Sequence, residues 1–168
     1  MTKAAPKQPF WKTTPLSKMT PSQWESLCDG CGKCCLVKLR DADTNQVIFT
    51  NVACKQLDLR SCQCKDYKNR KQIVPDCVQL SPRNIGRIDW LPETCAYKLV
   101  HRGADLPWWH PLISGSEDSV HDSKASVRNK TRPEGRLKMP GLIKRITRWP
   151  TPLEKPPAKY RRRKRVKR

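Results

Sequence analysis

Four cysteines fall within eight residues in the stretch Cys28-Asp29-Gly30-Cys31-Gly32-Lys33-Cys34-Cys35. A spacing of two residues between cysteines lets both thiolates reach one ion, because the chain turns back within a single loop. Gly30 and Gly32 permit the tight backbone angles that such a loop requires. We therefore expect the fold to be organised around a metal site at this stretch.

Downstream cysteines enlarge the set of candidate metal ligands. The full set is Cys28, Cys31, Cys34, Cys35, Cys54, Cys62, Cys64, Cys77 and Cys95. In a secreted chain this density would indicate a disulfide framework, but the count of nine is odd and the N-terminus has no apolar signal-peptide core. Metal or iron–sulfur ligation is therefore the favoured interpretation, with disulfides and free thiols as the two alternatives.

The spacing of the first cysteines does not select one metal. A structural zinc site takes four thiolates, or thiolates mixed with imidazoles, usually from two separated pairs. The C-x2-C-x2-C spacing also opens the bacterial ferredoxin motif, although the Cys-Pro that completes that motif is missing here. Soft thiolates suit zinc, iron–sulfur clusters and copper(I) alike. We predict zinc, iron or an iron–sulfur cluster as the cofactor.

The three histidines, His101, His110 and His121, are weaker candidate ligands. His110 lies between Trp109 and Pro111, where a packed loop residue is the simpler interpretation. His121 lies in a polar stretch typical of a surface, and His101 follows a predicted helix, whose C-terminal end a histidine favours. They stay candidates because imidazole is a ligand that suits iron.

The positive charge of the chain is concentrated in its C-terminal part. The chain has 35 Lys and Arg against 15 Asp and Glu, for a net charge of +20. Residues 124–168 hold 18 of these basic residues and only two acidic ones, Glu134 and Glu154. Many prolines and a terminal run of like charges leave too little apolar surface for this part to fold alone, although residues 139–149 suit a short basic amphipathic helix.

Three regions follow from composition and motif placement. We predict a flexible N-terminus over residues 1–9, a cysteine-cluster metal-binding domain over residues 10–128, and a disordered tail rich in Pro, Arg and Lys over residues 129–168.

Local signals predict short elements joined by long loops. Residues 20–23, Thr-Pro-Ser-Gln, are a helix start with a capping box. Residues 35–40 and 46–50 form a predicted β-hairpin, and a second helix is expected from Pro92 to a stop at Gly103. The predicted fold class is α+β: a small, loop-rich, metal-stabilised domain with short helices and a β-hairpin, followed by the disordered basic tail.

Several function classes lack their sequence signatures. No stretch approaches the ~18 consecutive apolar residues of a membrane-spanning helix, so we expect no transmembrane segment. No P-loop, dinucleotide-binding glycine run, nucleophile elbow or HExxH zinc motif occurs. With neither a signal peptide nor a membrane span, we expect a cytoplasmic protein, and no motif indicates a particular enzymatic reaction.

The sequence resembles the CxxCxxCC cysteine-cluster family, in particular its YcgN-like branch. The matching segments include ESLCDGCGKCCL from Glu25, FTNVACKQL from Phe49, CQCKDY from Cys62, PDCVQL from Pro75, WLPETCAYKL from Trp90 and DLPWWHPLISGS from Asp105. The resemblance spans about residues 10–128, contains all nine cysteines and His110, and implies a small cytoplasmic bacterial protein that chelates zinc or iron. Flagellin lysine methylases carry a similar cluster as more distant relatives. After about Arg128 the sequence departs from the family pattern.

These features lead to three hypotheses about function. The first is a metal-binding protein whose cysteines hold zinc or iron and whose metal supplies much of the folding energy. The second is an iron–sulfur enzyme or accessory protein that modifies a protein side chain, as the ferredoxin-like spacing and the methylase relatives suggest. The third is a nucleic-acid-associated protein, whose residues 129–168 bind nucleic acid, anionic lipid or an acidic protein surface electrostatically.

Overall fold

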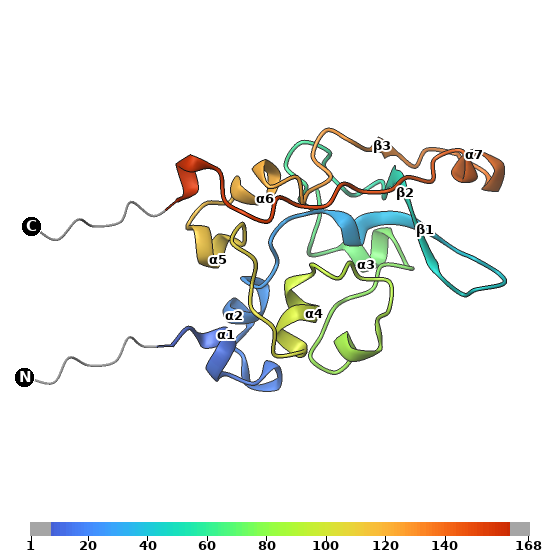
Figure 1. The fold of residues 1–168 in the computed structure, drawn as a ribbon. Helices are drawn as coiled ribbons and strands as arrows, with labels where there is room; N and C mark the ends of the chain where they lie inside the picture. The colour runs from blue at the N-terminus through green and yellow to red at the C-terminus, as the bar shows by residue number, and fades with distance from the viewer. Residues whose placement is uncertain (1–7, 162–168) are drawn as a thin grey trace, which may run out of the picture.

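The computed structural model describes residues 8–161, which form short helices around a small sheet (Figure 1). Residues 1–7, part of the predicted flexible N-terminus, and the arginine-rich residues 162–168 lie outside the described part. The α-helices are α1 (Phe10–Thr13), α2 (Pro21–Glu25), α3 (Arg70–Ile73), α4 (Ala96–His101), α5 (Pro111–Ser114), α6 (Ser119–Asp122) and α7 (Met139–Ile143). Single turns of 3-10 helix lie at Leu16–Lys18, Lys33–Cys35, Ile85–Arg87 and Ala158–Tyr160. None of the helices between residues 8 and 161 has the length and apolar character to span a bilayer.

The sheet has three strands in the order β1-β2-β3. Strands β1 (Leu36–Arg40) and β2 (Val47–Ala53) form the predicted hairpin, antiparallel from Arg40 opposite Val47 to Leu36 opposite Ala53. Strand β3 (Arg132–Pro133) adds a short parallel pairing on the other edge of β2. Together with the short helices, this sheet confirms the predicted α+β, loop-rich class.

The first helix signal is also confirmed. Thr20 caps α2 through a capping box, in which its side-chain oxygen accepts from Gln23 N–H at 3.2 Å. The Gln23 side-chain oxygen accepts in turn from Thr20 N–H at 3.0 Å. Both residues satisfy donors that the start of a helix leaves unpaired, so the local sequence sets where α2 begins.

The predicted start of the later helix at Pro92 is wrong by one turn. Cys95 N–H donates to Pro92 O at 2.9 Å, which closes a tight turn, and α4 begins only at Ala96. Cys95 itself has extended backbone angles as the residue before the helix. Gly103 ends this region as expected, with a φ of +71° in the left-handed region that favours glycine.

The apolar interior is divided into three small clusters. The first is Leu36, Ala53, Leu57, Cys62 and Val127; the second is Leu27, Ile85, Leu91 and Tyr97; the third is Trp109, Val120 and Ala125. Each cluster joins segments that are distant in sequence, and together they leave long loops between them. Such an interior is small for a chain of this length.

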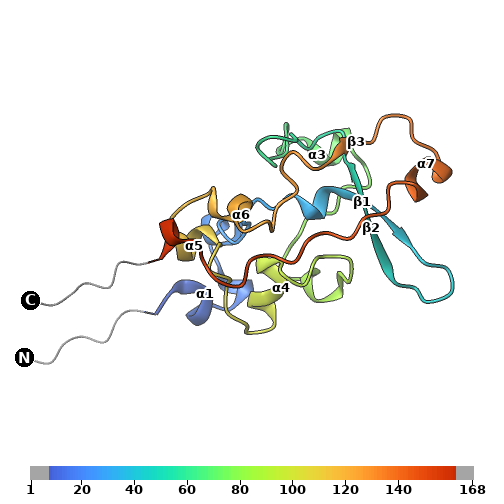
Figure 2. The same cartoon turned by 45° about the horizontal axis from the view of Figure 1, so that its top comes forward.

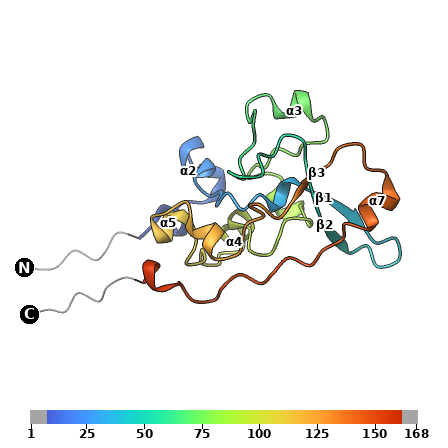
Figure 3. The same ribbon diagram turned by 90° about the horizontal axis from the view of Figure 1, so that it is seen from above.

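Residues 129–161 follow the surface of the body. Figures 1 and 3 show this segment leading from β3 to α7 at one end and returning along the body towards α5 and α6. Asn51 N–H donates to Arg145 O at 2.9 Å, and Thr147 N–H donates to Phe49 O at 3.0 Å. Trp149 packs against the first apolar cluster. The segment stays on the body because the edge of β2 offers backbone partners and apolar residues recur among its basic ones.

Candidate metal centre

The loop of residues 28–35, called the cluster loop below, carries the first four cysteines between α2 and β1. The Asp29 carboxylate closes its first turn by accepting a hydrogen bond from Cys31 N–H at 3.1 Å. Gly30 and Gly32 follow with φ values of +71° and +74°, in the left-handed region that costs a residue with a side chain about 1–2 kcal/mol. The expectation that these glycines shape the loop is confirmed.

Close packing behind Gly32 fixes the cluster loop against the body. A Cβ atom at this position would lie 2.8 Å from Val127 Cγ2 and 3.4 Å from Cys62 Cβ. Val127 N–H also donates to Cys31 O at 2.9 Å. Glycine is therefore required at position 32 for two independent reasons, its backbone angle and the lack of space for a side chain.

Four thiols form one electrostatic group, called the thiol group below: Cys28, Cys31, Cys34 and Cys95. Burial is the main cause that raises the pKa of Cys28 to about 12 and of Cys95 to about 11, and it also raises the pKa of Cys31. The pKa of Cys34 is raised first by its contact with Cys35 and then by burial. The Cys34 thiol further raises the pKa of the other three. A charge on one sulfur thus disfavours charge on the next, which is the situation that a bound cation reverses.

Backbone N–H groups favour the thiolate form of three of these sulfurs. The N–H group two residues further along the chain lowers the pKa of Cys28 and of Cys31. Cys95 precedes the first turn of α4, and the N–H groups of Tyr97 and Lys98 lower its pKa. Donors at a helix start stabilise thiolates, which are the form that binds metal.

Cys35 connects the thiol group to the β-hairpin. Its sulfur lies 3.7 Å from the sulfur of Cys34. Its carbonyl oxygen accepts from Cys54 N–H at 2.9 Å, directly beyond the Leu36–Ala53 pair that ends the hairpin. The hairpin therefore brings Cys54, which is 19 positions further along the sequence, next to the end of the cluster loop.

Two lysines lie beside the thiol group. Lys33 is buried, and Lys38 Nζ donates to the carbonyl oxygens of Cys34 and Leu36, both at 2.8 Å. Lys38 Nζ also lies 4.6 Å from the ring centroid of Trp90. Burial lowers the pKa of both lysines and the neighbouring thiols oppose that shift. The two ammonium groups are placed to offset part of the negative charge that several thiolates would carry.

One cavity of about 820 Å³ collects six of the nine candidate ligands. They are Cys28, Cys34, Cys35, Cys54, Cys64 and Cys77. Cys28 and Cys34 reach solvent in this cavity although protein surrounds them. The wall also contains Tyr67, whose hydroxyl donates to the Glu25 carboxylate at 2.8 Å, and Arg70. The volume lies in the range of about 300–1,000 Å³ that is usual for small-ligand sites, so it exceeds what one ion needs.

Cys62 lies apart from the thiol group. It is buried among Leu36, Ala53, Leu57 and Val127 in the first apolar cluster. Burial is the main cause that raises its pKa, followed by the influence of Arg128 and of the Val127 N–H group, which both lower it. The structure therefore places this predicted ligand in the position of an apolar core residue.

The sulfurs of the thiol group lie near one another but are not arranged around a single metal position. Across the described residues 8–161, no three Cys, His, Asp or Glu side chains have the arrangement that one metal ion requires. The donor set nevertheless fits a thiolate-bound metal, because the four thiols influence one another and three of them face backbone N–H groups. Rotation between staggered χ1 positions moves a cysteine sulfur without moving the backbone.

Asp29 is a member of the site that sequence reasoning missed. Its side chain is buried, and its charge raises the pKa of every thiol in the thiol group. A buried carboxylate beside four thiols makes this region favourable for a cation. The signal in the sequence was its position directly after the first ligand cysteine, but an Asp there equally serves to close a turn.

The histidines differ in how far they can act as ligands. His110 is fully buried, with Nε2 3.0 Å from Leu27 O and Nδ1 accepting from Leu112 N–H at 3.1 Å. Both ring nitrogens are engaged, which agrees with a packed loop residue. His121 lines the thiol-rich cavity, and its Nδ1 lies 2.7 Å from Ser126 Oγ.

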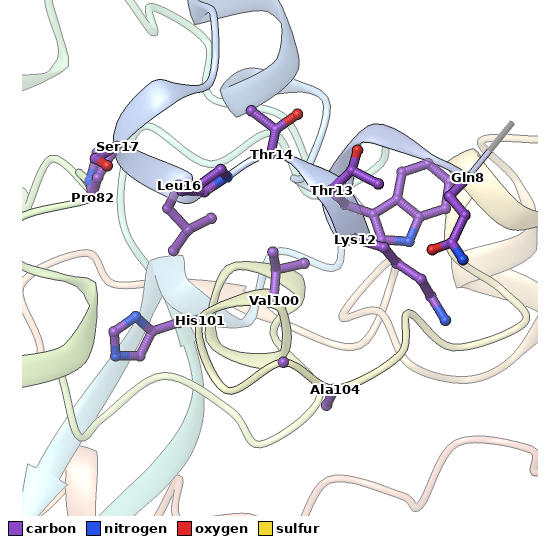
Figure 4. A pocket seen from close by; sticks show the side chains of 13 residues that line it. Gln8, Lys12, Thr13, Thr14, Leu16, Ser17, Pro82, Val100, His101 and Ala104 are labelled. Carbon is purple, nitrogen blue, oxygen red and sulfur yellow. The ribbon is translucent and has the colours of Figure 1, made fainter.

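A second cavity of about 650 Å³ lies between the N-terminal residues and α4 (Figure 4). Thr13, Thr14 and Ser17 contribute hydroxyl groups from one side, and Val100 and His101 line the other. No cysteine lines this cavity. His101 is thus separated from the candidate ligands, and the second cavity has no part in the metal centre.

Comparisons with known proteins agree with the geometry of the cysteines. The family model "CxxCxxCC: Putative zinc- or iron-chelating domain" matches residues 27–96. A UPF0260 protein of Brucella canis is 58% identical over 123 residues, which cover 73% of this chain and 81% of the relative. A UPF0260 protein of Rhodopseudomonas palustris is 50% identical over 159 residues, covering 90% of this chain and 94% of the relative. A UPF0260 protein of Gluconacetobacter diazotrophicus is 52% identical over 148 residues, which cover 88% of this chain and 91% of the relative. No solved structure matches the chain.

The comparisons also correct the predicted limit of the family resemblance. A match over 90% of the chain cannot be contained in residues 1–128, so the similarity to the Rhodopseudomonas palustris protein extends into residues 129–168. The departure expected after Arg128 is therefore wrong for this relative. Part of the C-terminal segment belongs to the shared sequence.

Proposed function

This chain belongs to the UPF0260 family and carries a CxxCxxCC domain at residues 27–96, and on this premise we propose that the thiol group binds zinc or iron. The observation that supports this proposal is the single electrostatic group formed by four thiols beside buried Asp29. Four thiolates are the ligand set of a structural zinc site and equally of an iron–sulfur cluster. The metal would supply the positive charge that offsets these thiolates.

The proposal gives the residues around the thiols defined tasks. The Gly30 and Gly32 backbone lets the cluster loop double back, and the Asp29 carboxylate holds its first turn. Lys33 and Lys38 reduce the net negative charge of a loaded site, since four thiolates exceed the charge of one divalent ion. Each task concerns the protein's own groups and holds for zinc and for iron.

Cys35, Cys54, Cys64 and Cys77 form a second set of thiols on the wall of the same cavity. Their position supports either a larger cluster or a second ion next to the first. Cys62 is the member of the predicted ligand set with the weakest support, because it packs among apolar side chains. A metal count per chain separates one ion from more than one.

The size of the cavity favours a second candidate function, an iron–sulfur enzyme or accessory protein that acts on a side chain of another protein. About 820 Å³ is more room than an ion requires, and Glu25, Tyr67 and Arg70 give its wall polar groups. This function predicts a brown, oxygen-sensitive protein with bound sulfide. A colourless protein with stoichiometric zinc and no sulfide would contradict it.

Alanine variants of single cysteines test the proposed ligands. We expect Cys28→Ala and Cys95→Ala, each in the full-length chain purified without oxygen, to lose most of the bound metal. Cys62→Ala is the control, because it also removes one sulfur but outside the thiol group. Metal content by elemental analysis is the readout, with the circular dichroism of each variant recorded beside it. Equal metal content in all three variants would contradict the assignment of the thiol group.

A further inference from the structure

Exposed apolar side chains gather at one place on the described structure. Four large ones lie within residues 137–146, around α7, and are called the α7 patch below: Leu137, Met139, Ile143 and Ile146. They are between 41% and 58% exposed. The other large apolar side chains that are exposed in the described part of the chain, Tyr67, Val78 and Ile113, lie in separate segments. A cluster of this kind marks an interaction surface more often than scattered exposed residues do.

The backbone of the α7 patch is held to the body. Ile146 forms an isolated antiparallel bridge with Thr50 of β2, and Asn51 N–H donates to Arg145 O at 2.9 Å. Leu137 lies against the helix, since a Cβ atom at Gly141 would be 3.1 Å from Leu137 Cδ2. An ordered segment therefore presents these side chains to solvent.

Only positive charges flank the apolar side chains of the α7 patch. The basic residues between positions 136 and 148 are Arg136, Lys138, Lys144, Arg145 and Arg148, and this stretch contains no Asp or Glu. All of them except Arg145 are exposed. The nearby turn of the β-hairpin carries Asp41 and Asp43 but extends away from α7 (Figure 1). The patch therefore combines an apolar centre with a basic border.

The α7 patch also lies at an end of the molecule. Figures 1, 2 and 3 show α7 at the opposite end of the body from α1 and α5, with no other helix in front of it. The hairpin turn lies at the same end, so a partner reaches α7 from the side that faces away from the hairpin.

We propose that the α7 patch docks onto an anionic membrane surface. Aliphatic side chains enter the boundary between headgroups and acyl chains, while lysines and arginines stay among anionic headgroups. Single-stranded nucleic acid is bound chiefly by aromatic side chains that stack on bases, and the α7 patch exposes none. A second copy of the chain would bring two like-charged borders together. Charge and side-chain type thus favour lipid over both.

Co-sedimentation with vesicles tests the docking surface on the full-length protein. We expect binding to vesicles that contain phosphatidylglycerol and much weaker binding to vesicles of phosphatidylcholine alone. The double variant Lys144→Gln/Arg148→Gln should bind the anionic vesicles about 25-fold more weakly, because each basic group near such a surface contributes a factor of about five.

A pair of isoleucine variants separates docking from simple charge attraction. Ile143→Ser in α7 should weaken binding to the anionic vesicles by about five- to tenfold. Ile113→Ser in α5 is the matched control, since Ile113 is similarly exposed in a helix of similar length, and it should bind like the unaltered protein. Equal binding to both kinds of vesicle, or an unchanged affinity of Ile143→Ser, would overturn the proposal. Tight binding of a single-stranded RNA, together with no binding to either kind of vesicle, would also overturn it.

Discussion

The cluster loop and the C-terminal segment of residues 129–161 both contain little regular secondary structure, yet different forces hold them in place. In the cluster loop, two left-handed glycines and the Asp29 carboxylate bring the thiols together. Their mutual repulsion, once ionised, needs a cation. In the C-terminal segment, backbone hydrogen bonds to β2 and a few side-chain anchors hold the chain. The first arrangement depends on a ligand, whereas the second is a sum of small contacts.

Removal of the metal should give the largest difference between the two regions. We expect a strong chelator to unfold residues 10–128 cooperatively, because metal binding to four thiolates contributes on the order of 10 kcal/mol to folding. The loss of helix signal in far-UV circular dichroism is the measurement. A spectrum that stays unchanged after the metal has been removed completely would show that the cluster loop, like the C-terminal segment, is held by the protein alone.

Acidification should weaken metal binding by the cluster loop. The pKa values of about 12 for Cys28 and about 11 for Cys95 leave these thiols protonated at neutral pH without metal, so each must lose its proton to bind. Affinity should therefore fall as pH falls, by about tenfold per pH unit for each proton displaced and by up to about 10⁴-fold for four. Competition with a chelator between about pH 8 and about pH 6 measures how steeply the metal affinity depends on pH. An affinity independent of pH would contradict thiolate ligation.

A methyl group at position 32 should damage the cluster loop with the ligands intact. Gly32→Ala places a side chain on a left-handed backbone and a Cβ atom 2.8 Å from Val127 Cγ2. We therefore expect the free energy of unfolding to fall by about 2–4 kcal/mol. Gly103→Ala is the matched control, with a similar φ of +71° and open space at its Cβ position, and it should lose about 1 kcal/mol. Denaturant unfolding of the metal-loaded proteins compares them. Equal losses of unfolding free energy in the two variants would mean that Val127 does not confine the cluster loop.

Substitutions in the C-terminal segment should have the smallest effects. Trp149→Ala removes a half-buried ring from the first apolar cluster and should cost about 2 kcal/mol, while leaving the metal content unchanged. Asp122→Asn weakens the contacts of α6 with Lys159 and with the Tyr160 hydroxyl, and its effect should be smaller still. Amide hydrogen exchange at Leu153, whose N–H donates to Ser123 O, reports release of the segment. A loss of metal in Trp149→Ala would show that the two regions are coupled.

The sequence predicts best those features that are decided within a few residues. The capping box of α2, the hairpin and the glycines of the cluster loop each follow from local spacing and backbone preference, and all three are confirmed. The start of α4 is displaced because Cys95 adopts an extended conformation in front of the helix, and no local preference reveals that.

Features that depend on distant contacts were not predictable in the same way. Asp29 acts on the nearby thiols of the cluster loop and also on Cys95, far along the chain, and the fold alone brings Cys95 into its electrostatic neighbourhood. Cys62 looks like a ligand in the sequence, but its burial among apolar residues depends on Val127 and the strands. The sequence of residues 129–161 indicates a segment that cannot fold alone. In the structure the edge of β2 supplies its backbone hydrogen-bond partners.

Metal and acid-labile sulfide content of the full-length protein, purified without oxygen, tests the central claim most directly. We expect zinc or iron in at least equimolar amount, with sulfide only if the iron is in a cluster. Iron with matching sulfide would direct the search towards chemistry in the thiol-lined cavity, and zinc alone would make the thiol group a structural site. A folded protein with neither metal above trace level would contradict the claim that the cluster loop is held by a metal.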